Sequence, residues 1–290
     1  MITISNPILS VSISEHGAEL QSIRKDGKEY LWQGDGRFWG RRSPVLFPFV
    51  GRVWNNVYRH EGTVYEMGQH GFARDMDFNL VSADADAAAF VLESTPETLM
   101  KYPFPFRLRI DYRLDGNAIT VGWHVENTGT CDLHFQIGAH PAFYFPELDL
   151  STDARGYFAF DRSEGLEYIS PAEKGCTSPE RHVLDVDVDG LMQVDVHTFD
   201  CDTYIFDNHQ LSKVSLLDKS RRPYVSLEFD APLVALWSPT KTHPDCPFVC
   251  IEPWYGRCDT VGYEGDLEHR EWMQHLKAGR TFDARYKIIL

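Results

Sequence analysis

Apolar and polar residues alternate along much of the chain. Every second residue is apolar in 106–114, and the alternation resumes in 119–125 after the turn sequence Asp115-Gly116-Asn117. Alternation with a period of two places the apolar side chains on one face of a strand. Asp-Gly between two such segments is a frequent hairpin turn. This stretch therefore predicts a β-hairpin with one buried face.

The same pattern recurs in three other parts of the chain. Residues 213–230 contain a turn between two strand-like halves, and the second half places its apolar side chains on one face. Residues 282–288 alternate in the same way. Residues 2–33 divide into short apolar segments separated by Asn-Pro, His-Gly and Asp-Gly, which are turn sequences. Many short strands are expected.

Helical periodicity is scarce. Residues 267–277, followed by Gly279, have the spacing and the stop signal of one short helix. Residues 82–94 are rich in alanine but stand between strand-like segments, so their type stays open. No linker or internal repeat divides the chain. The pattern predicts an all-β fold, a large antiparallel sandwich, and we interpret residues 1–290 as a single domain, with two β-domains as the alternative.

Composition and charge narrow the possible partners. The formal net charge is -15 and no cluster of Lys and Arg interrupts it, so neither nucleic acid nor an anionic membrane surface is an expected partner. No apolar run approaches the roughly 20 residues that span a bilayer, and the N-terminal sequence does not resemble a signal peptide. The 6 cysteines do not form a disulfide framework. A cytoplasmic protein is expected.

Five polar residues stand where the pattern favours apolar ones or turns. They are Arg52 after SPVLFPFVG, His70 and Arg74 in GQHGFARD, His140 in IGAHPAF and Glu252 in FVCIEPW. A structural role is the ordinary alternative for each, because buried histidines are commonly hydrogen-bonded, glutamates pair with surface arginines and arginines extend to solvent. Their joint occurrence favours a functional site.

His140 and Glu252 share a local feature, since each ends an apolar run and directly precedes a proline. Proline holds the preceding residue in extended geometry and does not continue a strand ladder. We therefore expect both side chains at strand ends that border a cleft. Gly138, on the same face as His140, is expected to leave room for a ligand. Nearby aromatic residues suit a sugar ring, although most of them are expected in the core: Phe72, Phe143, Trp237, Trp254 and Tyr255.

Other kinds of site are less well supported. His243, Cys246, Cys250 and Cys258 superficially resemble a zinc site, but Cys250 is expected within a strand rather than in a metal-binding turn. The chain contains no phosphate-binding glycine loop, no G-x-S-x-G nucleophile turn and no EF-hand spacing. We expect neither a metal nor a cofactor.

Several motifs together resemble the aldose 1-epimerase (galactose mutarotase-like) family, and most closely its short bacterial members encoded beside lactose genes. The motifs are SPVLFPFVGR, QHGFARD, IGAHPAF, IFDNHQLSKVSL and CIEPWYG followed by GDLEHREW, and they run in the order of the family from about residue 43 to 276. The resemblance implies a β-supersandwich of large antiparallel sheets with an open sugar cleft. It also implies interconversion of the α and β anomers of a free hexose.

The resemblance also implies roles for individual residues. Glu252 matches the general base of the family and His140 its general acid. His70 matches a second histidine that contacts the sugar, and Arg52 an arginine near the sugar hydroxyls. Asp207, in IFDNHQ, resembles the substrate-binding aspartate.

Two further residues, Arg74 and Trp254, are expected to contact the substrate beside these motifs. The implied chemistry removes one proton from the C1 hydroxyl and delivers one to the ring oxygen. Attraction between Glu252 and His140 is expected to keep the first ionised and the second protonated.

Alternatives remain at this stage. A related branch resembles hexose-6-phosphate mutarotases, in which Arg52 and Arg74 would bind the phosphate. The acidic chain and the lack of a further arginine cluster favour a free sugar. A glycosidase would use Glu252 with Asp207 as its two carboxylates. A non-catalytic sugar-binding or sensing protein on the same fold is the third alternative. The sequence leaves the oligomeric state open.

Overall fold

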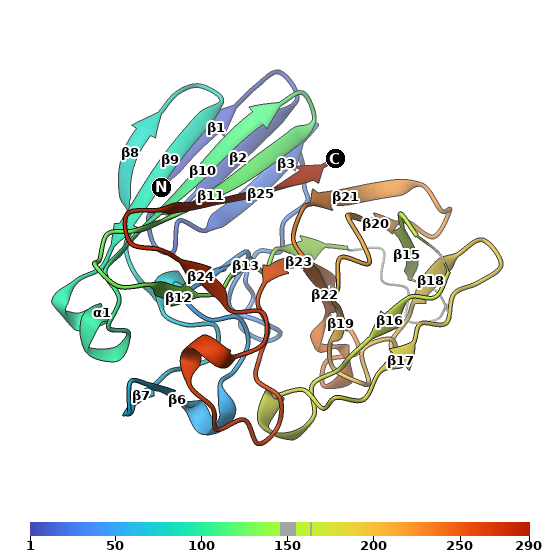
Figure 1. Ribbon diagram of the computed structural model, residues 1–290. Helices are drawn as coiled ribbons and strands as arrows, with labels where there is room; N and C mark the ends of the chain where they lie inside the picture. Colours follow the sequence, from blue (N-terminus) through green and yellow to red (C-terminus); the bar gives the residue numbers. More distant parts are fainter. Residues whose placement is uncertain (146–154, 163) are drawn as a thin grey trace.

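The computed structural model describes residues 1–145, 155–162 and 164–290 (Figure 1). Its largest element is a nine-stranded antiparallel sheet. In spatial order its strands are β18 (Leu191–Val194), β15 (Gly156–Phe160), β20 (Lys213–Leu217), β21 (Pro223–Phe229), β25 (Thr281–Ile289), β11 (Ala118–Asn127), β10 (Phe106–Asp115), β9 (Ala87–Glu93) and β8 (Asn79–Ala83).

A six-stranded sheet lies below the middle of the large sheet in Figure 1. Its strands are β19 (Tyr204–Phe206), β22 (Leu233–Trp237), β23 (Phe248–Tyr255), β13 (Ile137–Ala139), β5 (Val45–Leu46) and β14 (Ala142–Tyr144), which pairs with β23. A four-stranded sheet lies behind β8–β11 in the same view, with strands β1 (Ile2–Ser5), β2 (Leu9–Ile13), β3 (Leu20–Lys25) and β4 (Lys28–Glu29).

The remaining elements are short. Three two-stranded sheets pair β12 (Leu133–Phe135) with β24 (Gln274–Leu276), β16 (Glu167–Tyr168) with β17 (His182–Val183) and β6 (Val57–His60) with β7 (Thr63–Glu66). The described helical segments are α1 (Pro96–Lys101) and the 3-10 turns η1 (Trp54–Asn56), η2 (Ala73–Asp75), η3 (Glu173–Gly175), η4 (Pro239–Lys241) and η5 (Leu267–His269).

The predicted strands are confirmed where alternation was clearest. β10 and β11 form the predicted hairpin, and the residues of β10 alternate strictly between buried and less buried positions. β20 pairs with β21 as predicted, and residues 282–288 lie within β25. The all-β class with large antiparallel sheets is therefore confirmed.

The helix predicted for residues 267–277 is wrong. This stretch contains the single turn η5, and a positive φ of 61° at Trp272 separates it from β24. Its apolar residues are buried by a folded loop and a strand pair rather than by one helix face. The alanine-rich segment is also strand, because Ala88 and Ala89 are buried within β9 between two neighbouring strands. Tertiary burial overrides the helical preference of alanine.

The six-stranded sheet has one face toward the core. Tyr255 of β23 connects this face to the nine-stranded sheet: its ring centroid lies 5.1 Å from that of Phe282 and 6.4 Å from that of Trp123. One hydrophobic cluster contains side chains from all three larger sheets. Residues on the other face of the six-stranded sheet border the cleft described below. The described part of the chain contains no helix with the length and apolar character that crossing a bilayer requires.

A buried ion pair anchors the segments around that cleft. The Arg270 Nε lies 2.6 Å from the Asp259 carboxylate, and the two side chains are 2% and 4% exposed. Asp259 also accepts a hydrogen bond from the Trp54 N–H at 2.7 Å, and its own N–H donates to the Arg52 carbonyl at 2.9 Å. The pair therefore joins the segment that carries Arg52 to the C-terminal part of the chain.

We predict that Asp259→Asn lowers the free energy of unfolding by about 3–5 kcal/mol, because it leaves the Arg270 charge buried without its counter-ion. Glu228→Gln is the matched control, since its ion pair with Lys213 is 43% exposed on both sides and should contribute less than about 1 kcal/mol. Urea unfolding measures both. Equal losses in the two variants would contradict the assignment of Asp259 as an anchor.

Candidate active site

The strand register brings His140 and Glu252 together. β13 and β14 both pair with β23, through Gly138 opposite Trp254 and Ala142 opposite Cys250. Residues 140 and 141 fall between these two strands, and the same register places His140 opposite Glu252. Directly opposite residues point to the same face of a sheet. The His140 Nε2 lies 3.3 Å from the Glu252 Oε2.

The expectation that both residues end strands is only half right. His140 follows the last residue of β13, but Glu252 and Pro253 lie within β23. No pairing with β13 or β14 is formed opposite residues 251–253. A proline is tolerated where a ladder is interrupted, because its missing N–H leaves no partner unpaired. The cleft therefore opens at a gap in the pairing beside a central strand.

Gly138 makes room for a side chain rather than for a ligand. A Cβ at this position would lie 2.6 Å from the Trp254 ring, which is closer than van der Waals contact permits. The glycine therefore lets the indole of the opposite residue lie flat across the strand pair. The expectation of ligand space at Gly138 is wrong for this reason.

The His140 ring is enclosed by three other rings. Trp39 stacks on it with centroids 4.6 Å apart and an interplanar angle of 28°. Trp237 and His70 approach with their planes nearly perpendicular to it, at 5.5 and 5.7 Å. This enclosure holds the imidazole in one orientation and keeps water from most of its surface.

His70 has a defined tautomer. The backbone N–H of Gly51 donates to the His70 Nδ1 at 3.0 Å, and the backbone N–H of His70 donates to the Gly51 carbonyl at 2.8 Å. Because Nδ1 accepts a backbone hydrogen bond, the ring proton resides on Nε2. Burial lowers the pKa of His70 well below its ordinary value, and His140 adds to this. His70 is therefore a neutral imidazole with Nε2–H as its donor.

Burial also sets the protonation of the central pair. It raises the pKa of Glu252 well above its ordinary value, with a further rise from Asp202 and an opposing effect of the Trp254 indole. It lowers the pKa of His140 to about 3, and the Arg74 charge adds to this. The side chains are 1% and 10% exposed, so desolvation outweighs the attraction expected to ionise both. Burial therefore favours the uncharged form of each residue, a protonated carboxyl group beside a neutral imidazole.

Six of the seven predicted site residues line one cleft of about 790 Å³. They are Arg52, His70, Arg74, His140, Glu252 and Trp254. Phe72, Phe143 and Tyr255 instead pack in or against the main hydrophobic core. Trp237 is the remaining aromatic residue of the predicted set that borders the cleft.

Asp207 lies outside this cleft. Its two carboxylate oxygens accept hydrogen bonds from Arg181 at 2.9 and 2.8 Å, and its side chain is 3% exposed. Asp202 borders the cleft in its place, with a positive φ of 77° and a hydrogen bond from the Thr203 hydroxyl at 2.6 Å. A glycosidase that pairs Glu252 with Asp207 therefore lacks its second carboxylate at the cleft.

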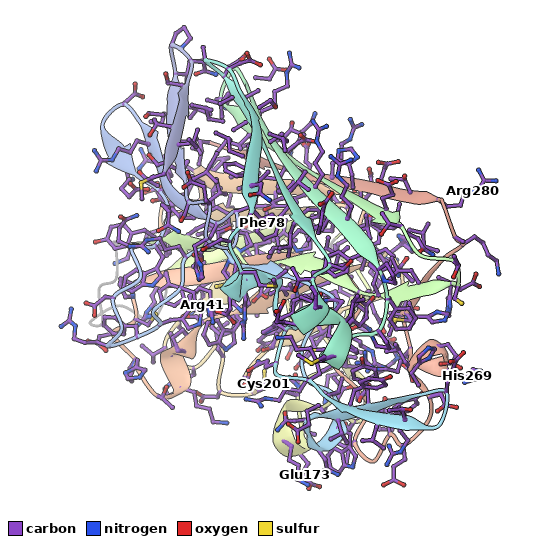
Figure 2. The ribbon with its side chains drawn as sticks, turned by 90° about the vertical axis from the view of Figure 1, so that its left-hand side faces the viewer. Arg41, Phe78, Glu173, Cys201, His269 and Arg280 are labelled. Atoms are coloured by element: carbon purple, nitrogen blue, oxygen red, sulfur yellow. The ribbon has the colours of Figure 1, made fainter. Side chains whose placement is uncertain are left out.

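Sequence inspection missed Trp39, Asp202, Thr203 and Lys174, which also line the cleft. Figure 2 labels Cys201 and Glu173, the chain neighbours of Asp202 and Lys174, on the lower part of the molecule. None of the four lies in an alternating strand pattern or a recognised motif. The only local signal was Trp39, an aromatic residue in a polar segment between two glycines, Gly36 and Gly40.

The cleft has a basic wall that the sequence did not reveal. Arg52, Arg74 and Lys174 line it, and Arg41 lies close enough to lower the pKa of both histidines. The expectation that no further arginine cluster stands near the motifs is therefore wrong, because Arg41 joins Arg52 and Arg74 around the two histidines. The four cations come from separate segments and meet only in the fold.

The suspected zinc residues do not form a cluster. Among the described residues, the groups of three or more potential ligands are His140 with Cys250 and Glu252, and Asp266 with Glu268 and His269. Burial raises the pKa of both Cys250 and Glu252 well above their ordinary values. Metal ligands must be deprotonated, so this buried set does not favour a resident cation.

We predict that Glu252→Gln stabilises the protein increasingly as pH rises from 5 to 8. Above the ordinary carboxyl pKa of 4.5 the unfolded chain loses the Glu252 proton while the folded chain keeps it. Wild-type stability then falls by up to about 1.4 kcal/mol per pH unit, whereas the amide has no such loss. Thermal unfolding at several pH values measures the difference, with Glu164→Gln at an exposed position as the control. A difference that is constant with pH would contradict the burial argument.

Comparisons with known proteins identify the family and agree with the fold. The family model described as aldose 1-epimerase matches residues 1–288. The plasmid-encoded protein LacX of Lactococcus lactis subsp. lactis is 30% identical over 304 aligned residues, which cover 100% of this chain and 99% of that protein.

Two solved structures share the fold over almost the whole chain. A galactose mutarotase related enzyme from Lactobacillus acidophilus is 34% identical, with a TM-score of 0.91 over 99% of this chain and 96% of that one. A galactose mutarotase-like protein from Lactobacillus casei is 30% identical, with a TM-score of 0.93 over 100% and 99%. As its motifs predicted, the chain belongs to the aldose 1-epimerase family.

Proposed function

We propose that the protein is an aldose 1-epimerase that interconverts the α and β anomers of a free hexose. The observation that carries this proposal is the pair of His140 and Glu252 in the cleft, 3.3 Å apart. The His140 Nδ1 is buried and has no hydrogen-bond partner among the described residues, and the contact of the Glu252 Oε2 with the His140 Nε2 does not have the geometry of a hydrogen bond. A buried polar atom without a hydrogen bond costs free energy unless a ligand supplies the missing partner.

The chemistry of mutarotation matches an acid and a base at this spacing. Glu252 takes the proton of the C1 hydroxyl, the C1–O5 bond breaks and a C1 carbonyl forms, while His140 delivers a proton to O5. Rotation about C1–C2 then presents the other carbonyl face, and the ring closes with both transfers reversed. Each positioned group contributes typically about 10²–10⁴ in rate.

The pair already holds the one proton that this cycle needs. Transfer of the proton from Glu252 to His140 converts the neutral pair into a carboxylate and an imidazolium, which are the reactive forms. Sugar hydroxyls that donate to the Glu252 Oε2 favour the carboxylate, because hydrogen bonds to a charged form stabilise it. The resting protonation of the site is therefore compatible with Glu252 as base and His140 as acid.

Neighbouring groups in the cleft support the binding of a sugar. The His70 Nε2–H is a donor, Asp202 is an acceptor and Arg52 supplies further donors along the wall of the cleft. Trp39, Trp237 and Trp254 offer apolar surfaces that suit the C–H faces of a pyranose.

Anomer exchange in Glu252→Gln tests the proposal. We predict that wild type accelerates the approach of fresh α-D-glucose and α-D-galactose to their anomeric equilibrium, and that the variant loses at least 10²-fold of this acceleration because it removes the base. Polarimetry and NMR follow the exchange. Exchange by the variant at the wild-type rate would contradict the proposal. Binding of a sugar without exchange by wild type would instead identify a non-catalytic sugar-binding protein.

A hexose 6-phosphate is the second candidate substrate, favoured by the basic wall. Arg52, Arg74 and Lys174 line the cleft, and guanidinium groups suit phosphate geometry. Lys174 is 53% exposed at the side chain, with its ammonium 4.4 Å from the Trp54 ring centroid and 2.8 Å from the Asn55 carboxamide oxygen. It can therefore reach a charged group at the open end of the cleft.

The variant Lys174→Gln distinguishes between the two candidate substrates, a free hexose and a hexose 6-phosphate. If a phosphate binds at the basic wall, we predict that this variant lowers kcat/KM for glucose 6-phosphate at least 10-fold, with a change of less than 3-fold for glucose. A coupled assay suits the phosphorylated sugar, and Lys213→Gln on β20 of the large sheet, outside the cleft, is the charge-matched control. An unchanged ratio between the two sugars in Lys174→Gln would exclude Lys174 from phosphate binding and favour the free hexose.

A further inference from the structure

Two histidines face each other across a strand pair outside the cleft. β12 and β24 form a two-stranded antiparallel sheet in which His134 lies directly opposite His275. Their Nδ1 atoms are 2.9 Å apart, and the ring centroids are 5.0 Å apart with nearly perpendicular planes. Only one proton fits between two nitrogens at this distance, so at least one of the rings is neutral and presents a lone pair.

A third imidazole lies beside this pair. His60, at the end of β6, has its ring centroid 6.0 Å from that of His134. The His60 Nδ1 faces the Glu268 Oε2 at 3.5 Å. Among the described residues, the ring nitrogens of His60, His134 and His275 do not all lie within ligand distance of one another. His60 and Glu268 therefore border the pair without joining it. Figure 2 shows His269 on the turn η5 beside the β6–β7 hairpin, and Glu268 precedes it on that turn.

The separation of the two Nδ1 atoms matches that of neighbouring metal ligands. Two nitrogens that each lie about 2.0–2.1 Å from one ion and subtend a right angle are about 2.9 Å apart. Right angles between ligands occur in the square-planar and octahedral sites of Cu²⁺ and Ni²⁺, and imidazole suits both ions. Small rotations of the two rings would direct both lone pairs to one point.

The surroundings favour entry and retention of a cation. His275 is exposed, whereas His60 and His134 are half-buried, so the pair is reachable from solvent on one side. Asp132 and Glu268 carry the nearby negative charges that act on His134. Lys277 is paired with Asp132 at 2.6 Å, which directs its ammonium toward that carboxylate.

We propose that His134 and His275 bind a divalent transition-metal ion of the Cu²⁺ and Ni²⁺ class through their Nδ1 atoms, with water as the remaining ligands. The ion would replace the proton between the two Nδ1 atoms and tie β12 to β24. β12 leads directly into β13 and His140, so the ion would fasten the segment that carries the acid of the cleft. Because the site exists only when the two strands are paired, metal binding stabilises the folded chain.

Thermal unfolding and calorimetric titration of the tag-free chain with NiCl₂ or CuCl₂ test this proposal. We expect Tm to rise with added metal, and His134→Gln and His275→Gln each to lower the affinity at least 10-fold and remove the rise in Tm. His60→Gln should bind the metal with an affinity within about 3-fold of wild type, because His60 lies beside the pair and is not a ligand. His16→Gln is the matched control, because His16 is an exposed histidine in a distant ion pair with Asp77, and it should behave as wild type.

A second measurement covers the case in which a strand variant folds poorly. Electron paramagnetic resonance of wild type with one equivalent of Cu²⁺ should show hyperfine coupling to at least two imidazole nitrogens. The proposal fails if neither metal raises Tm at 1 mM, if His134→Gln and His275→Gln bind as wild type does, or if Cu²⁺ shows oxygen ligands alone. These readouts do not depend on catalysis, so their outcome is independent of the proposed sugar chemistry.

Discussion

The pairing of β23 with β13 and β14 is the constraint on which the site depends. Its register sets His140 opposite Glu252, and the interruption between β13 and β14 leaves the two side chains facing a cleft. A slip of β23 by one residue would turn Glu252 to the other face of the sheet, toward the hydrophobic core and away from His140. On the other side of β23, Ala235 is opposite Glu252, and its small side chain leaves space above the carboxyl group.

The same strand pairing buries two polar side chains, which lowers the stability of the folded chain. Glu252 and His140 are buried, and burial holds each near its uncharged form. Aromatic rings fix the imidazole, and a backbone hydrogen bond fixes the tautomer of His70. Proteins accept unsatisfied or strained groups of this kind mainly at functional sites, and other interactions offset the cost. The buried pair of Asp259 and Arg270 is one such anchor beside the cleft.

Much of the fold was predictable because alternation is a local signal. The hairpin of β10 and β11 could be recognised from its own residues, whereas residues 267–277 could not, since their burial depends on partners elsewhere in the chain. The acid, the base and the second histidine could be predicted because each lies in a recognisable motif. All three line the cleft. Asp202 escaped prediction because it lies in a turn with a positive φ, outside any alternating strand pattern. The basic wall likewise arises only when separate segments fold together.

The central claim is that His140 and Glu252 act as one unit on a sugar. A double-mutant cycle on anomer exchange, with His140→Gln, Glu252→Gln and the double variant, measures this most directly. Residues that act as a unit give strongly non-additive losses. We therefore expect each single variant to lose nearly all acceleration and the double variant to lose little more. Losses that multiply, or a single variant that retains the wild-type rate, would contradict the account.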